Sequence, residues 1–218
     1  LVQDDRRGGV MSESAAFQDL FYSARASVDN EIGVFKSKRL MYDVAKQLRL
    51  DVSYKIRDGL RDRELYSSTP IIVDFTDIDP LQSISMTATL LENRQVELKD
   101  FQWGKEESNL VKVLLPGDTL RTPVGDIMVT IAPLIERDYI GKPVQISKRS
   151  LKAVSDSYNS RLKVDVDNKM SSIINLTLED VNIKRAEDVI NTLIEVYKND
   201  AILDKNQVLE STANFIRE

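Results

Sequence analysis

The sequence predicts an α+β fold: a mixed, mostly antiparallel sheet with helices packed on one face and a long C-terminal helix that extends from the domain. Helical patterns occupy the first quarter of the chain, and short β-branched and aromatic runs separated by turn signals follow. Helical periodicity then returns toward the end. Such a segregated order of elements is typical of α+β architecture. The 218 residues suffice for one large domain or two small ones.

The first part of the chain is predicted to be helical. Residues 1–9 form a lead-in, and 12–21 begin with a serine that can cap a short helix. Between 27 and 50 the apolar residues before Ser37 lie on one helical face and those after it on another. Two helices, with Ser37 as the N-cap of the second, explain this change of face; a kinked single helix is the alternative.

The middle of the chain contains the predicted strands. Asp58-Gly59 and Glu92-Asn93 are expected to be the turns of two hairpins. The β-branched and aromatic composition of the flanking runs favours strands. The predicted strands span residues 51–57, 61–66, 69–77, 83–91, 94–101, 110–115, 125–133 and 142–148.

The last third alternates helix, strand and helix. Ser150 is expected to cap a helix over 151–164, a strand follows at 171–180, and the final helix begins around Asn182. At 1.5 Å per residue the final helix would be roughly 50–55 Å long, more than the ~30 Å of a small domain. The predicted buried stripe of this helix is Ile183, Ala186, Ile190, Leu193, Tyr197 and Ala201.

The final helix is expected to leave the domain after about Ala201. The next positions of its stripe, Asp204 and Lys205, are charged, and no glycine or proline ends the helix. Together with a first residue, Leu1, that is not methionine, this predicts a piece of a longer protein. Either the helix continues as a stalk toward a coiled-coil hairpin, or it simply frays at its end.

Composition excludes several functional classes. The chain has no cysteine and no histidine, which excludes disulfides, thiol nucleophiles, histidine-dependent triads and the usual zinc sites. The net charge of -5 argues against a nucleic-acid partner. No apolar run approaches the ~20 residues that span a bilayer.

Two sequence features invite a chemical interpretation. One feature is a cluster of carboxylates, Asp74, Asp77 and Asp79, yet their spacing is not that of a calcium loop. The acidic residues of the stretch 165–170 also lack the spacing of a calcium loop. Trp103 is the sole tryptophan and suits either sugar stacking or an anchoring role, but aromatic residues are only 6% of the chain. The sequence therefore predicts no catalytic, cofactor-binding or metal-ligating residue and no cofactor.

Three blocks of the sequence resemble the chain-length determinant (Wzz-type) domain of polysaccharide co-polymerases. The block 31–54 resembles its opening, the block 176–197 its closing strand and helix, and the block 64–75 the versions associated with bacterial tyrosine autokinases. The matching residues of the first block are Phe35, Lys36, Ser37, Leu40, Val44, Leu48 and Leu50. Those of the closing block are Asp180, Ala186, Val189, Ile190, Asn191, Leu193 and Tyr197.

The resemblance implies a non-enzymatic role. Residues 1–181 would be the periplasmic base domain of an inner-membrane protein, and 182–218 the start of a long stalk helix, with both transmembrane segments outside the sequence. Members of this family form homo-oligomeric rings that control the length or export of capsular polysaccharide, exopolysaccharide or O-antigen.

The same resemblance implies partners. These are the polysaccharide polymerase, the nascent glycan and an outer-membrane export channel, with no nucleic acid. The sequence has no nucleotide-binding P-loop, and whether a tyrosine kinase domain follows stays open. The alternative function is an extracytoplasmic ligand- or glycan-sensing domain of a membrane signalling protein.

Overall fold

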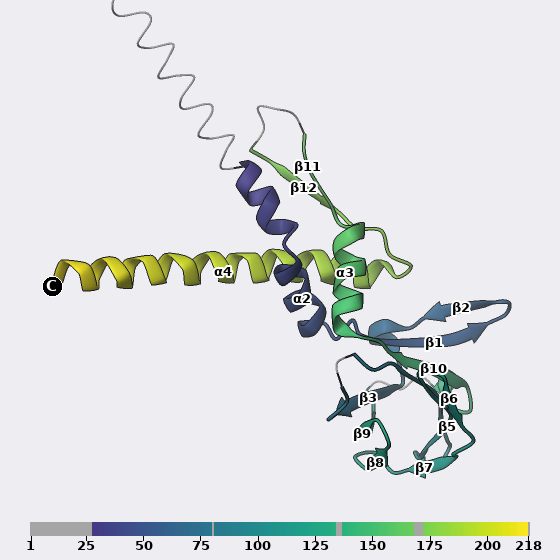
Figure 1. The fold of residues 1–218 in the computed structure, drawn as a ribbon. Helices are drawn as coiled ribbons and strands as arrows, with labels where there is room; N and C mark the ends of the chain where they lie inside the picture. The colour runs from purple at the N-terminus through teal and green to yellow at the C-terminus, as the bar shows by residue number, and fades with distance from the viewer. Residues whose placement is uncertain (1–27, 80, 134–136, 168–171, 218) are drawn as a thin grey trace, which may run out of the picture.

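The computed structural model describes residues 28–79, 81–133, 137–167 and 172–217. The predicted lead-in at 1–9 and the predicted helix at 12–21 lie outside these residues. Within them, the fold is α+β with antiparallel strand pairing and a long C-terminal helix, which confirms the predicted class. Figure 1 shows the helices gathered to one side of strands β1 to β10, with the last helix projecting well beyond its neighbours.

Two sheets build the β part of the molecule. The larger sheet has seven antiparallel strands, in the order β2 (Arg61–Glu64), β1 (Val52–Asp58), β10 (Pro143–Lys148), β4 (Ile84–Leu90), β5 (Val96–Trp103) and β6 (Glu106–Ser108), with β7 (Lys112–Leu114) also paired to β5. The smaller sheet has the order β3 (Ile71–Thr76), β9 (Gly125–Ile131) and β8 (Thr119–Thr122). Alternate side chains of both sheets enter one shared apolar core, as the two-residue period of strands requires.

The predicted hairpins are confirmed. β1 pairs with β2 across Gly59, whose φ of 61° suits a residue without a Cβ, and β4 pairs with β5 across residues 91–95. Three short strands were missed: β6, β8 and β11 (Lys163–Val166). The first two contain few buried residues, so their sequences lack a hydrophobic pattern that would reveal them.

The helices form a second apolar core. A helix at 28–35 and α2 (Lys38–Gln47) meet at Ser37, which confirms two helices rather than one, although the Ser37 side chain makes no capping hydrogen bond. The predicted helix at 151–164 is shorter, α3 (Leu151–Arg161), because the chain turns extended at Leu162 to enter β11. The Ser150 hydroxyl accepts from the Ala153 N–H, as predicted. β11 pairs with β12 (Ile174–Thr177) in a hairpin beside the helices.

The last helix, α4 (Ile183–Arg217), has 35 residues and is therefore about 52 Å long. Val189 and Leu193 are fully buried, whereas residues 202–212 are all exposed. The predicted stripe is wrong at its first position, since Ile183 is 78% exposed. α4 contacts α2 where the two helices cross (Figure 1), and Val189 and Leu193 lie in the helical core.

Two short 3₁₀ helices, Tyr66–Ser68 and Arg137–Tyr139, lie in the connections between strands. Arg49, just after α2, has a left-handed backbone with φ of 52°, and the Leu50 N–H donates to the Ala45 carbonyl. This pattern ends the helix as a Schellman motif, in which glycine usually takes the left-handed position. The chain can then turn directly into β1.

Candidate functional site

The carboxylates that the sequence places together do not converge. The Asp74 carboxylate pairs with the Arg49 guanidinium at 2.7 Å, while the Asp79 carboxylate accepts from the Leu81 N–H at 2.8 Å. Asp77 has a left-handed backbone with φ of 57°. Within the described ranges, no three acidic, histidine or cysteine side chains are grouped so that they could hold a metal ion. Part of the stretch 165–170 lies outside those ranges.

Trp103 ends β5 and is partly buried against the β core. Its indole N–H donates to the Glu106 carboxylate at 2.9 Å across the turn at Gly104. The indole also lines a shallow open groove with Leu81 and Lys105. The hydrogen bond connects the ends of β5 and β6 across the turn, and Trp103 stays partly exposed at the groove.

A buried ion network joins the start of α4 to the β part. The Asp180 carboxylate is completely buried and accepts from Arg185 Nη2 at 2.7 Å, from the Tyr158 hydroxyl at 2.9 Å and from the Asn182 N–H at 2.9 Å. Arg185 Nη1 lies 3.3 Å from Glu64 Oε2, and that carboxylate is also nearly buried. We call Glu64, Tyr158, Asp180 and Arg185 the base network.

Local structure positions each member of the base network. The Asn182 side chain accepts from the Arg185 N–H at 3.0 Å, so Asn182 is the N-cap of α4 and sets the direction of the Arg185 side chain. Glu64 at the end of β2 accepts from the Ser53 hydroxyl at 2.6 Å and the Tyr54 N–H at 3.1 Å on the neighbouring strand. Both carboxylates therefore have several donors, as buried charges require.

Burial and hydrogen bonding oppose each other at Asp180. Burial alone would raise the pKa of its carboxyl group, but the hydrogen bonds from Arg185 and from the Asn182 N–H outweigh it and lower the pKa. For Arg185 burial acts in the opposite direction, and the hydrogen bond to Asp180 raises the pKa of the guanidinium. These opposite shifts in pKa both favour the charged forms of Asp180 and Arg185, so the ion pair between them is maintained at neutral pH.

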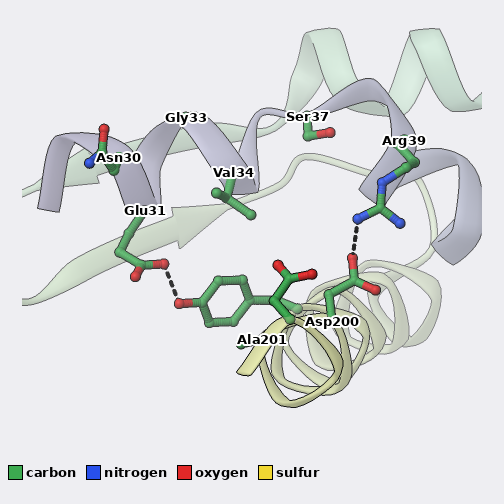
Figure 2. A pocket seen from close by; sticks show the side chains of 10 residues that line it. Asn30, Glu31, Gly33, Val34, Ser37, Arg39, Asp200 and Ala201 are labelled. Atoms are coloured by element: carbon green, nitrogen blue, oxygen red, sulfur yellow. Dashed lines mark hydrogen bonds and ion pairs between the residues drawn. The ribbon is translucent and has the colours of Figure 1, made fainter. Parts of the chain in front are cut away.

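A second polar arrangement holds the helix at 28–35 and the first turn of α2 against α4. The Tyr197 hydroxyl donates to the Glu31 carboxylate, and Arg39 forms an ion pair with Asp200 (Figure 2). The Tyr197 ring also packs on Phe35, with ring centroids 4.5 Å apart. An open groove of about 610 Å³ lies between these contacts, and Val34 lines it. Its mixed polar and apolar lining suits contact with another protein segment more than chemistry on a small molecule.

Replacing Tyr197 with phenylalanine should loosen the helix at 28–35. The hydrogen bond to Glu31 and burial together raise the pKa of Tyr197 to about 12, so the hydroxyl is a donor at neutral pH. Its loss should cost about 1 kcal/mol, while the ring contact with Phe35 is kept. Amide hydrogen exchange should become faster within residues 31–36 and stay unchanged in β4, and equal protection in both proteins would contradict the contact.

Sequence reasoning found part of this site. The resemblance singles out Asp180 and Tyr197, whereas Glu64, Tyr158 and Arg185 are not among its matching residues. No local signal links these residues, because Glu64 and Arg185 are far apart in sequence.

Comparison with models of protein families and with curated proteins finds no match to this chain. In the described part of the chain, no helix has the length and apolarity that a bilayer-spanning segment needs.

Proposed function

We propose that the chain is the periplasmic part of a polysaccharide co-polymerase of the chain-length determinant type. In this proposal it acts as a membrane-anchored scaffold and not as an enzyme. It assembles into a homo-oligomeric ring in the inner membrane and controls the length or export of capsular polysaccharide, exopolysaccharide or O-antigen. Its partners are the polymerase, the growing glycan and an outer-membrane channel.

The convergence of the three resembling sequence blocks supports this proposal. Block 31–54 contributes the Ser53 and Tyr54 donors, block 64–75 contributes Glu64, and block 176–197 contributes Asp180 and Arg185. Parts of all three blocks, which lie far apart in the sequence, therefore meet at the base network, although only Asp180 is among the matching residues. This network anchors the first turn of α4 to the β part, which is the arrangement that a rigid stalk would need at its base.

The exposed half of α4 supports a role in assembly. Ile202, Leu203, Val208 and Leu209 are each more than half exposed, although they are aliphatic. Exposed apolar side chains along a helix are typical of a surface that contacts another protein. In the proposed ring, these side chains contact a further helical segment or a neighbouring protomer.

A genetic experiment tests the proposal. Deleting the gene that encodes this chain should change the length distribution or the amount of surface polysaccharide, measured by gel electrophoresis of extracted glycan. The intact gene should restore the original pattern. A gene with Leu209→Asp should not, because the substitution replaces an exposed apolar side chain of α4 with a charge.

Asn206→Asp is the matched control. Asn206 is exposed on the same helix, and the substitution introduces the same charge without removing an apolar side chain. It should restore the polysaccharide fully. Unchanged polysaccharide in the deletion strain would overturn the proposal and favour the alternative, an extracytoplasmic sensing domain.

A further inference from the structure

A small basic pocket lies where the end of α2 meets the β part. It has a volume of about 190 Å³, and its lining includes the cations Lys46, Arg49 and Lys148, the carboxylate Asp51 and the ring of Phe75. The chain as a whole has a net charge of -5, so this lining is opposite in sign to the average surface. A concave site lined by one sign of charge attracts counter-ions.

Lys148 is the most buried cation of the pocket. It is the last residue of β10 and is only 9% exposed, and its ammonium lies 3.2 Å from an Asp51 carboxylate oxygen. The Arg149 N–H donates to the Asp51 carbonyl at 2.8 Å, which holds the two segments together. Because folding already desolvates this ammonium, a ligand that contacts it would not bear that cost.

Arg49 is held in place beside it. The guanidinium contacts the Asp74 carboxylate at 2.7 Å and donates to the Val73 carbonyl at 2.9 Å, both on β3. The backbone of Arg49 is left-handed, with φ of 52°, a conformation that favours glycine. These contacts fix the guanidinium at the edge of the pocket.

Lys46 provides the remaining positive charge. It lies in the last turn of α2, is exposed, and takes part in no ion pair with any residue that the structure describes. Asp51 balances Lys148 and Asp74 balances Arg49, so the charge of Lys46 is left unbalanced. An anion in the pocket would therefore complete the charge balance.

We propose that this pocket binds a compact oxyanion, either the carboxylate of an acidic sugar or a phosphate group. Lys46 and the accessible sides of Arg49 and Lys148 would contact the oxygens, and Phe75 would contact the apolar part of the ligand. This inference does not rest on the proposed scaffold function. Anion binding is measured on the purified chain, whereas the scaffold function is tested by polysaccharide length in cells. A negative result in one experiment therefore does not contradict the other proposal.

Titration followed by nuclear magnetic resonance tests the inference. The ¹⁵N-labelled chain is titrated with sodium glucuronate, sodium phosphate and, as a neutral probe, glucose, at constant ionic strength. We expect saturable shift changes at the amides of Lys46, Arg49 and Lys148 with one or both anions and none with glucose. A response to glucuronate alone identifies an acidic sugar as the ligand, and a response to phosphate alone identifies a phosphate group. A response to both means that the pocket recognises the oxyanion that the two ligands share.

Lys46→Glu should weaken this binding about tenfold, since it replaces an attractive charge with a repulsive one. Lys46 is exposed, so the variant should fold like the original chain. Lys38→Glu, an exposed change at the other end of α2, should bind as the original chain does. The inference is overturned if neither anion shifts these amides, or if Lys46→Glu binds as tightly as Lys38→Glu.

Discussion

Replacing Asp180 with alanine should lower the free energy of unfolding by about 3 kcal/mol. The substitution removes a fully buried carboxylate and leaves the Arg185 guanidinium, itself mostly buried, with Glu64 as its remaining ion-pair partner in the base network. Breaking a buried ion pair from one side costs about 3–5 kcal/mol, because the other charge stays desolvated. Urea denaturation followed by circular dichroism measures the change.

The neighbouring residue provides the control. Glu179 is also acidic, but its side chain is 81% exposed and pairs with Lys163 on the surface. Glu179→Ala should therefore change stability by less than about 1 kcal/mol. Equal effects of the two substitutions would mean that the base network does not anchor α4.

The contribution of Asp180 to the free energy of unfolding should decrease at low pH. The pKa of Asp180 is lowered in the folded chain, so the ionised carboxylate stabilises the fold. This stabilisation is complete above the unfolded pKa of about 3.9 and is lost as the pH falls through the lower folded value. The stability difference between the original chain and Asp180→Asn should be constant from about pH 5 to 7 and shrink below about pH 4. A stability difference between the two proteins that stays constant down to pH 2 would contradict the stabilising role of the ionised Asp180 carboxylate.

Replacing Leu193 with alanine should destabilise the chain by about 3 kcal/mol. Leu193 is fully buried at the place where α4 packs into the helical core. Truncating a buried leucine removes its transfer free energy and leaves a cavity, at a cost of about 2–5 kcal/mol. For a chain of this size, the midpoint of thermal unfolding should fall by about 6–12 °C in calorimetry.

Leu203→Ala is the matched control on the same helix. Leu203 is 58% exposed and lies in the half of α4 beyond the helical core. The same chemical change should alter the free energy of unfolding by less than about 0.5 kcal/mol. If the two variants had the same midpoint of thermal unfolding, the division of α4 into a packed half and an exposed half would be wrong.

Much of the secondary structure could be predicted because its signals are local. The turn at Asp58-Gly59, the serine cap at Ser150 and the change of apolar face at Ser37 each involve residues within a few positions of one another. A turn residue or a capping side chain acts on its own stretch of backbone, so its effect does not depend on the rest of the fold.

The strand order could not be predicted in the same way. β10 lies between β1 and β4, although residues 59–83 separate those two strands in the sequence. Val144 and Ile146 show that β10 has a buried face, but many partners would cover an alternating strand equally well. The choice follows from closing two sheets around one core, which is a property of all the strands together.

By itself, the sequence determined the fold class, most helices and hairpins, and the existence of a last helix too long for its domain. Only the tertiary structure decided that Glu64 and Asp180 share one arginine, that Ile183 is exposed while Val189 is buried, and that Lys148 faces a basic pocket. Periodicity and caps act over one or two helical turns. Burial and charge pairing instead depend on which distant surfaces meet, and the chain specifies that only when the whole core is packed.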